Sequence, residues 1–109
     1  FLSNSLRMGV LGWSKALSDE VAPKGITVNS VCPGSTRTAR ITNIFQSQSE
    51  ATDKTIEEIE SHAAANIPML RIGEPKELAA LIAFLASERA SYMTGLAIQV
   101  DGGSARTFY

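Results

Sequence analysis

The sequence is poor in the residues that define several special structural classes. Its 109 residues include one cysteine, Cys32, and one histidine, His62. A single cysteine cannot form a disulfide framework, and one histidine provides no cluster of metal ligands. Cys32 lies in an apolar run, which predicts a buried thiol in a protein of a reducing compartment. We therefore expect neither a disulfide-stabilised fold nor a metal site.

Long hydrophobic runs and an excess of charge are also lacking. No apolar run approaches the roughly 18 residues that a membrane span needs, and no basic stretch followed by an apolar one marks a signal peptide. The net charge of −1 gives no electrostatic reason to expect nucleic acid or an anionic membrane as the main partner. With 44% hydrophobic and 19% charged residues, the sequence indicates a globular core. We expect a cytoplasmic location.

The start of the chain is unusual, because Phe1 is not an initiator methionine and a helical pattern begins at once, without a preceding cap or turn. This pattern is typical of a chain entered midway. We therefore expect the 109 residues to be a fragment of a longer polypeptide.

The apolar pattern of residues 2–22 predicts a helix, which Pro23 and Gly25 end. Two glycines inside it, Gly9 and Gly12, each cost about 1 kcal/mol relative to alanine, so they indicate close approach of another backbone. The apolar stripe of this helix has spacings of three and four residues: Leu6, Val10, Trp13, Leu17 and Val21.

Two segments have the features of strands. Residues 26–32 are rich in β-branched side chains, and residues 96–100 form a short alternating run. The first predicts a central strand of a parallel sheet. Within it, Asn29 is expected to bond a neighbouring backbone. After the second, Asp101 is expected to cap backbone amides in a turn with two glycines.

Residues 39–66 are polar and irregular at first and then helical, with a capping box at Thr55 and Glu58. Their apolar face is thin, consisting of Ile56, Ile59 and Ala63. The segment is a candidate for a mobile flap over a site, and a solvated surface helix is the alternative.

A firmer helix follows, with Pro75 in its first turn and an apolar run to residue 87. Leu78, Leu81, Ile82 and Leu85 are expected to pack on the sheet. The order of elements predicts an α/β fold, half of a doubly wound parallel sheet, which would leave apolar surface exposed without further strands or subunits.

Two regions carry a family resemblance. The first runs from Gly25-Ile26-Thr27-Val28-Asn29 through Pro33-Gly34 to Thr38, and the second is "IPMLRIGEPKELAALIAFLASERASYMTGLAIQVDGG", residues 67–103. Their order and spacing resemble the C-terminal half of a short-chain dehydrogenase/reductase, in particular the 3-oxoacyl-acyl-carrier-protein reductase group. The resemblance implies a Rossmann-type fold, NAD or NADP as cofactor, and hydride transfer between nicotinamide and a carbonyl or alcohol, with a 3-oxoacyl thioester as one candidate substrate.

The same resemblance implies cofactor-binding residues. The family's Pro-Gly-x-x-x-Thr pattern falls on Pro33, Gly34 and Thr38. In members of the family, the backbone of this loop contacts the nicotinamide end of the cofactor, and the threonine hydroxyl contacts the carboxamide or the pyrophosphate. Thr36 is a further candidate in this loop, although the family more often has an aliphatic residue there. Arg37 either meets a phosphate or acidic substrate or faces solvent. The glycine-rich phosphate loop lies in the N-terminal half of the family and is absent here, so the fragment alone is expected to be inactive.

The catalytic motif of the family has changed. Its Tyr-x-x-x-Lys falls on Ser3 and Arg7, which keep the spacing of one helical turn. Serine is a much weaker acid than a phenol and is shorter by a ring. Arg7 keeps the positive charge and is expected, by the resemblance, to reach the ribose hydroxyls of the cofactor, although a guanidinium does not replace an ammonium freely. Three interpretations stay open. Ser3 orients a carbonyl while water or a residue outside the chain supplies the proton; the protein has lost reductase chemistry; or both residues are ordinary surface residues.

The function predicted from the sequence is therefore that of a fragment of an NAD(P)-dependent oxidoreductase. The alternative is a catalytically inactive nucleotide-binding or oligomerisation module of the same fold. The resemblance also implies a homo-oligomer, a tetramer or dimer, with Trp13 and Phe84 as core or subunit contacts. A small carbonyl or alcohol substrate is the other expected partner.

Overall fold

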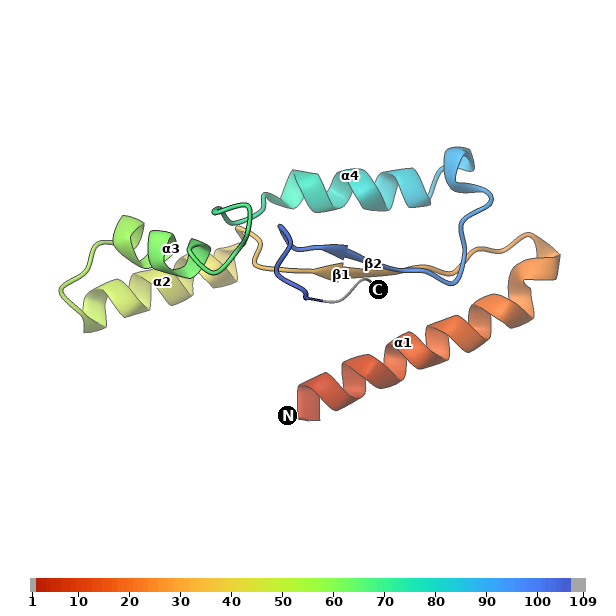
Figure 1. The fold of residues 1–109 in the computed structure, drawn as a ribbon, viewed down its shortest axis with the longest axis horizontal. Helices are drawn as coiled ribbons and strands as arrows, with labels where there is room; N and C mark the ends of the chain where they lie inside the picture. Colours follow the sequence, from red (N-terminus) through yellow and green to blue (C-terminus); the bar gives the residue numbers. More distant parts are fainter. Residues whose placement is uncertain (1, 107–109) are drawn as a thin grey trace. The chain divides into compact units, whose positions relative to one another are not determined.

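The computed structural model describes residues 2–106 (Figure 1). The chain divides into two compact units, one of residues 2–32 with Leu81–Ile98 and one of Pro33–Ala80 with residues 99–106. The elements in chain order are α1 (Leu2–Val21), the short 3-10 helix η1 (Ala22–Lys24), β1 (Ser30–Pro33), α2 (Ala39–Ala51), α3 (Ile56–Ala64), α4 (Pro75–Leu85), the 3-10 helix η2 (Glu88–Ala90) and β2 (Ala97–Val100).

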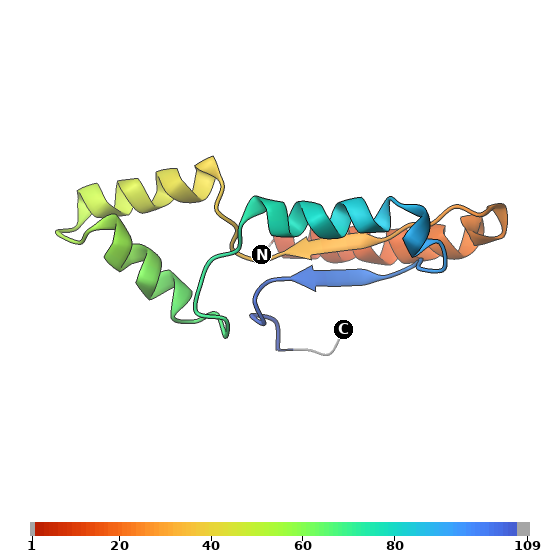
Figure 2. The ribbon, with the colours of Figure 1, turned by 90° about the horizontal axis from the view of Figure 1, so that it is seen from above.

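The strands β1 and β2 pair in parallel, as predicted. The Ser30 amide donates to the Leu96 carbonyl at 2.7 Å, and the Gly34 amide donates to the Val100 carbonyl at 2.9 Å. Both partners advance four residues in the same direction, so the two strands point the same way, as Figure 2 shows.

The strand predicted at residues 26–32 begins later than expected, at Ser30. The preceding residues pair with a loop instead of a strand. Val28 donates its amide to Thr94 Oγ1 at 3.0 Å and accepts from the Gly95 amide at 2.7 Å. Asn29 donates from Nδ2 to the Met93 carbonyl at 3.0 Å, which confirms its predicted role of bonding backbone. These bonds hold the segment extended without a regular ladder.

The helix predicted at residues 2–22 is confirmed by α1 and η1, but its buried face differs from the prediction. Ser18 is fully buried, with its hydroxyl donating to the Lys15 carbonyl at 2.7 Å. Trp13 is 64% exposed, and four other large apolar residues on α1 are also exposed: Leu2, Leu6, Met8 and Val10. The least exposed positions of α1 are Leu11, Ser14, Leu17, Ser18 and Val21. The predicted stripe is therefore right at Leu17 and Val21 and wrong nearer the start of the helix, where the inner face includes polar Ser14.

The expected close approach of another backbone to Gly9 and Gly12 is wrong for the part of the chain that the structure describes. A Cβ atom added at either position would meet nothing within 4 Å outside the helix itself. By contrast, Gly95 has a φ of 71°, and a Cβ there would lie 2.7 Å from Ser18 Oγ. The glycine required by packing in this unit is therefore in the loop before β2.

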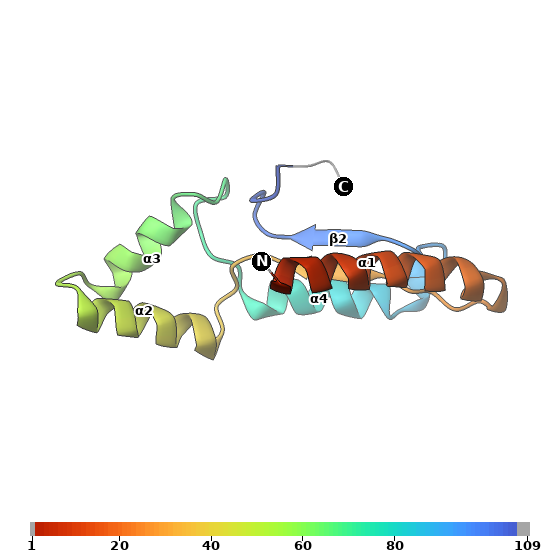
Figure 3. The ribbon, with the colours of Figure 1, turned by 90° about the horizontal axis from the view of Figure 1, so that it is seen from below.

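In the second unit, α2 and α3 form a helical hairpin with its own apolar core (Figures 1 and 3). Phe45, Ile59 and Ile72 are buried together, and Ile41 and Ala63 pack against them. The segment expected to be irregular at first is helical from Ala39 onward, because Thr38 caps α2. The capping box of Thr55 and Glu58 is confirmed at the start of α3.

The helix α4 begins at Pro75 as predicted and ends at Leu85. Leu78, Leu81 and Leu85 are half-buried, but Ile82 is 50% exposed, so its predicted packing on the sheet is wrong. Phe84 is likewise exposed, and Cys32 of β1 is a free thiol that is only half-buried. Apolar surface is thus left uncovered on both α1 and α4, as half a doubly wound sheet predicts.

Candidate functional site

The loop of residues 33–38 connects β1 to α2 and is held on its backbone. The Arg37 amide donates to the Gly73 carbonyl at 2.8 Å, and the Gly73 amide donates to the Ser35 carbonyl at 3.0 Å. Thr36 pairs with Gly73 in a parallel bridge. The loop is therefore a fixed part of the second unit, which makes it suited to present side chains at a defined place.

Gly34 is required by the approach of another backbone. A Cβ atom added to it would lie 2.7 Å from the Cα of Asp101, directly after β2. Such a distance is not tolerated, so packing within the protein is enough to explain this glycine. The Asp101 carboxylate accepts from the Gly103 amide at 2.9 Å and from the Ala105 amide at 2.8 Å, as predicted for a cap. These backbone bonds, with that of Ala105 first, lower the pKa of Asp101.

The two threonines of the loop have different surroundings. Thr36 donates its hydroxyl to the Gly34 carbonyl at 3.2 Å, which uses its proton inside the loop. Thr38 Oγ1 accepts from the Ile41 amide at 3.4 Å as the N-cap of α2. Since this bond uses an oxygen lone pair, the Thr38 proton can still be donated to a ligand.

The four predicted cofactor residues of this loop line one cavity, which we call the loop cavity. Its volume is about 470 Å³. Pro33, Gly34, Thr36 and Thr38 lie on its wall together with Ser35, Arg40, Ile41, Ile44, Pro75 and Leu78. The structure therefore brings together the residues that the sequence pattern selected, in a setting that is mainly apolar with a few hydroxyl groups.

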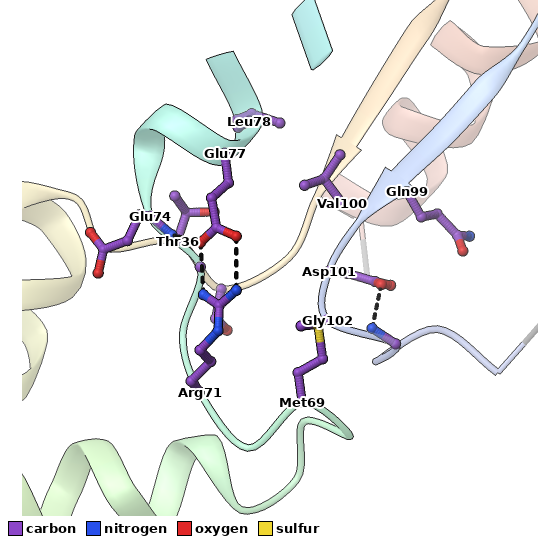
Figure 4. A pocket seen from close by; sticks show the side chains of 13 residues that line it. Thr36, Met69, Arg71, Glu74, Glu77, Leu78, Gln99, Val100, Asp101 and Gly102 are labelled. Atoms are coloured by element: carbon purple, nitrogen blue, oxygen red, sulfur yellow. Dashed lines mark hydrogen bonds and ion pairs between the residues drawn. The ribbon is translucent and has the colours of Figure 1, made fainter. Parts of the chain in front are cut away.

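A second cavity of about 260 Å³ shares Ser35, Thr36 and Leu78 with the loop cavity (Figure 4). Each of its charged groups already has partners, and two of them, Arg71 and Glu77, bond to each other. Arg71 donates to both oxygens of Glu77, at 2.7 and 2.8 Å, and the Glu74 amide donates to the same carboxylate at 3.0 Å. The Arg71 bond, followed by the Glu74 amide, lowers the pKa of Glu77 from 4.5 to about 2. Because these groups are already paired, this cavity is a weaker candidate for a ligand site.

Arg37 was predicted either to meet an anionic ligand or to face solvent. In the structure its charge is instead paired with two carboxylates of the protein. Its guanidinium donates to both oxygens of Glu60 on α3 and, from Nε at 3.0 Å, to Glu74 before α4. The hydrogen bonds to Glu60 raise the pKa of Arg37 most, and they lower the pKa of Glu60. Arg37 therefore ties the loop to α3 and to the start of α4.

Ser3 and Arg7 lie on α1, one turn apart, and both are exposed. They belong to the first unit, whereas all the loop residues belong to the second. The structure thus groups four of the five predicted cofactor residues in the loop cavity and places the fifth, Arg7, with Ser3 on α1.

Three functional features could not be read from the sequence. The Arg37 partners are 23 and 37 residues away along the chain. The Arg71–Glu77 pair spans a loop and a helix start, and the cavity wall formed by Ile41 and Ile44 required α2 to begin at Ala39. The sequence did contain a signal for that helix, namely Thr38 as an N-cap followed by apolar residues at Ile41, Ile44 and Phe45.

Across residues 2–106, no group of side chains is arranged to bind a metal ion, and no helix has the length and apolarity to cross a membrane.

Comparisons with known proteins show that the chain is similar to reductases. The family model described as enoyl-(acyl carrier protein) reductase matches residues 3–105. A putative ketoacyl reductase of the monensin polyketide synthase from Streptomyces virginiae is 45% identical over 95 residues, 87% of this chain and 36% of the relative. The NADPH-dependent reductase BacG of Bacillus subtilis is 40% identical over 111 residues, 98% of this chain and 41% of the relative.

A solved structure is similar at the level of the fold and the sequence. L-sorbose reductase of Gluconobacter frateurii, in complex with NADPH and L-sorbose, matches with a TM-score of 0.91 and 31% identity, over 96% of this chain and 40% of that protein. The chain thus spans about two fifths of the length of the relatives it matches.

Proposed function

The chain belongs to the short-chain dehydrogenase/reductase family, with its Rossmann-type α/β fold, and on that basis we propose that it is the C-terminal portion of an NAD(P)-dependent oxidoreductase. The proposed reaction moves a hydride between nicotinamide and a carbonyl or alcohol, with 3-oxoacyl thioesters among the candidate substrates. One observation carries the proposal, namely that Pro33, Gly34, Thr36 and Thr38 line a single cavity. The reductases to which the chain is similar support the same reaction class.

The residues of the loop cavity fit the nicotinamide end of such a cofactor. The Thr38 hydroxyl has a proton to donate to a carboxamide or phosphate oxygen, and Pro33 offers an apolar surface to a flat ring. Gly34 and Thr36 would contact the cofactor through their backbone atoms, which the Thr36 hydroxyl holds in place by donating to the Gly34 carbonyl. The cofactor supplies or accepts the hydride when bound. NADPH is named for BacG and for the L-sorbose reductase complex, which supports a nicotinamide dinucleotide, NAD or NADP, as the cofactor here.

For the catalytic pair, we propose that Arg7 binds ribose hydroxyls and that Ser3 orients the substrate oxygen. A serine hydroxyl lacks the acidity of a phenol, so the proton would come from water or from a residue outside this chain. The loss of that phenol also favours the competing function, a nucleotide-binding or oligomerisation module without turnover.

The remaining proposals concern the whole protein. Ile41 and Ile44 of α2 line the loop cavity, so residues 39–66 are proposed as a flap on the substrate side of a single NAD(P)-binding domain. The exposed apolar residues of α1 support a homo-oligomer or a missing part of the same chain. A cytoplasmic location is proposed because the free thiol Cys32 fits a reducing compartment.

The test uses the full-length protein that contains this chain. Binding of NADPH and NADH is measured by fluorescence, and hydride transfer by cofactor absorbance with a panel of ketones, alcohols and 3-oxoacyl thioesters. We expect cofactor binding and turnover. Binding without any turnover would leave the inactive module as the function. Ser3→Ala and Arg7→Met should each lower kcat/KM, with Arg89→Met as a control for charge loss, and unchanged turnover in both would remove this pair from the site.

A further inference from the structure

One face of α2 carries a cavity wall and an adjoining groove. The loop cavity takes Arg40, Ile41 and Ile44 from this helix. The groove, which we call the α2 groove, is lined by Arg40, Asn43, Ile44, Ser47 and Gln48. Arg40 and Ile44 belong to both, so the two spaces meet at these residues.

Among the described residues, Arg40 is the only charged side chain in either lining. Its charge is also uncompensated, because it forms no ion pair with any of residues 2–106. The two other arginines near the cavities differ in this respect, since Arg37 is bound by Glu60 and Glu74 and Arg71 by Glu77. A lone guanidinium at the edge of an apolar cavity is positioned to attract an anion.

The loop cavity and the α2 groove suit two chemically different parts of one ligand. Inside the loop cavity, Ile41, Ile44 and Leu78 present apolar surface suited to a carbon chain. Along the α2 groove, Asn43, Ser47 and Gln48 present amides and a hydroxyl suited to a polar arm. Arg40 stands where these two parts of the ligand would join.

We propose that Arg40 is a specificity-determining residue that binds an anionic group, a carboxylate or a phosphate, on the substrate. The carbonyl-bearing chain lies against Ile41 and Ile44, and the guanidinium donates to the oxygens of the anion in the bidentate geometry that arginine favours. This inference rests on the proposed function, since it assigns the substrate side of the same cavity.

The test compares substrates that differ only in the anion. One pair is levulinate and its methyl ester; the other is the acetoacetyl thioesters of phosphopantetheine and of pantetheine. In the full-length protein, Arg40→Met should lower kcat/KM for the anionic member of at least one pair by about tenfold or more, because it removes the charge-assisted hydrogen bonds to the anion. The neutral members should change less than about twofold, and Arg40→Lys should recover part of the loss.

The pair that responds identifies the anion as carboxylate or phosphate. Arg89→Met, which removes an exposed arginine of η2, is the matched control and should change neither pair. Equal losses for anionic and neutral substrates, or no loss for either pair, would overturn the assignment.

Binding is measured separately by calorimetry with the same compounds, so that the result does not depend on turnover. An anion-selective rise in Kd for Arg40→Met supports the inference even if no hydride transfer occurs, in which case only the proposed reaction fails. Equal Kd values in wild type and variant for all four compounds would refute the role of Arg40 while leaving the reductase function intact.

Discussion

Arg37→Met tests whether an ion-pair cluster holds α3 in place. In the structure the guanidinium binds Glu60 on α3 through two donors and Glu74 through Nε at 3.0 Å. Methionine keeps much of the length of the side chain but removes the charge and every donor. Both carboxylates then lose their partner, and the only ion-pair link between loop 33–38 and α3 in the described chain is broken.

The size of the effect follows from exposure. The Arg37 side chain is 43% exposed and that of Glu60 is 27% exposed, so solvent weakens both pairs. Exposed ion pairs contribute roughly 0.2–1 kcal/mol each. Two pairs, one of them bidentate, therefore give a loss of about 1 kcal/mol. A loss of this size changes the equilibrium for local opening of α3 about fivefold.

Hydrogen exchange measured by mass spectrometry on the full-length protein provides the assay. Amides of α3 (Ile56–Ala64) should exchange about fivefold faster in Arg37→Met, while those of α1 stay unchanged. Arg71→Met is the matched control, because it removes a bidentate pair with Glu77 that does not involve α3. Unchanged exchange in α3, or equal acceleration in the control, would refute the reasoning.

The same ion pair predicts the direction of a pH effect. The pKa of Glu60 is lowered in the folded protein, chiefly by its hydrogen bond to Arg37. A carboxyl of this kind adds stability above its unfolded pKa of 4.5, and the contribution is lost as the pH falls through the lower folded value. Exchange in α3 of the wild type should therefore approach that of Arg37→Met in acid, and high salt should also reduce the difference.

Three further changes are predicted in urea denaturation of the full-length protein. Gly34→Ala should lower the free energy of unfolding by about 1–3 kcal/mol, because its Cβ would meet the Asp101 backbone. Gly9→Ala, which meets nothing, should instead raise it by about 0.5–1 kcal/mol, and the same sign for both would contradict the packing argument. Leu70 has a φ of 56°, so Leu70→Gly should raise stability by about 0.5 kcal/mol, whereas Met69→Gly should not. The pKa of Asp101 is lowered in the folded protein, so its contribution to the free energy of unfolding is lost as the pH falls through that value. In Asp101→Asn the free energy of unfolding should therefore decrease less between neutral and acid pH than in the wild type.

The sequence was informative where local chemistry decides structure. The Thr55–Glu58 capping box, the start of α4 at Pro75 and the Asp101 cap all depend on residues within four positions of one another. The parallel pairing of β1 and β2 was also predictable, because an intervening helical stretch makes a parallel crossover the usual connection.

Prediction failed where distant parts of the chain decide structure. Ser18 is buried because Gly95 approaches it, and no helical pattern assigns a serine to the inner face. Residues 26–29 have strand-forming side chains, yet the loop at residues 93–96 takes their backbone bonds. For the candidate site, the family pattern selected the loop residues in advance but did not select Arg40, because the two spaces that Arg40 lines come together only in the folded chain.

The short parallel sheet has a consequence for how the protein folds. Within residues 2–106, β1 and β2 pair only with each other, so each strand has an outer edge with backbone donors and acceptors left to pair. Their own contact closes a loop of more than sixty residues, which is a slow step compared with forming the α2–α3 hairpin. We expect the helical hairpin to form early and the strands late, and a newly made chain to be most prone to aggregate through these edges until further strands cover them.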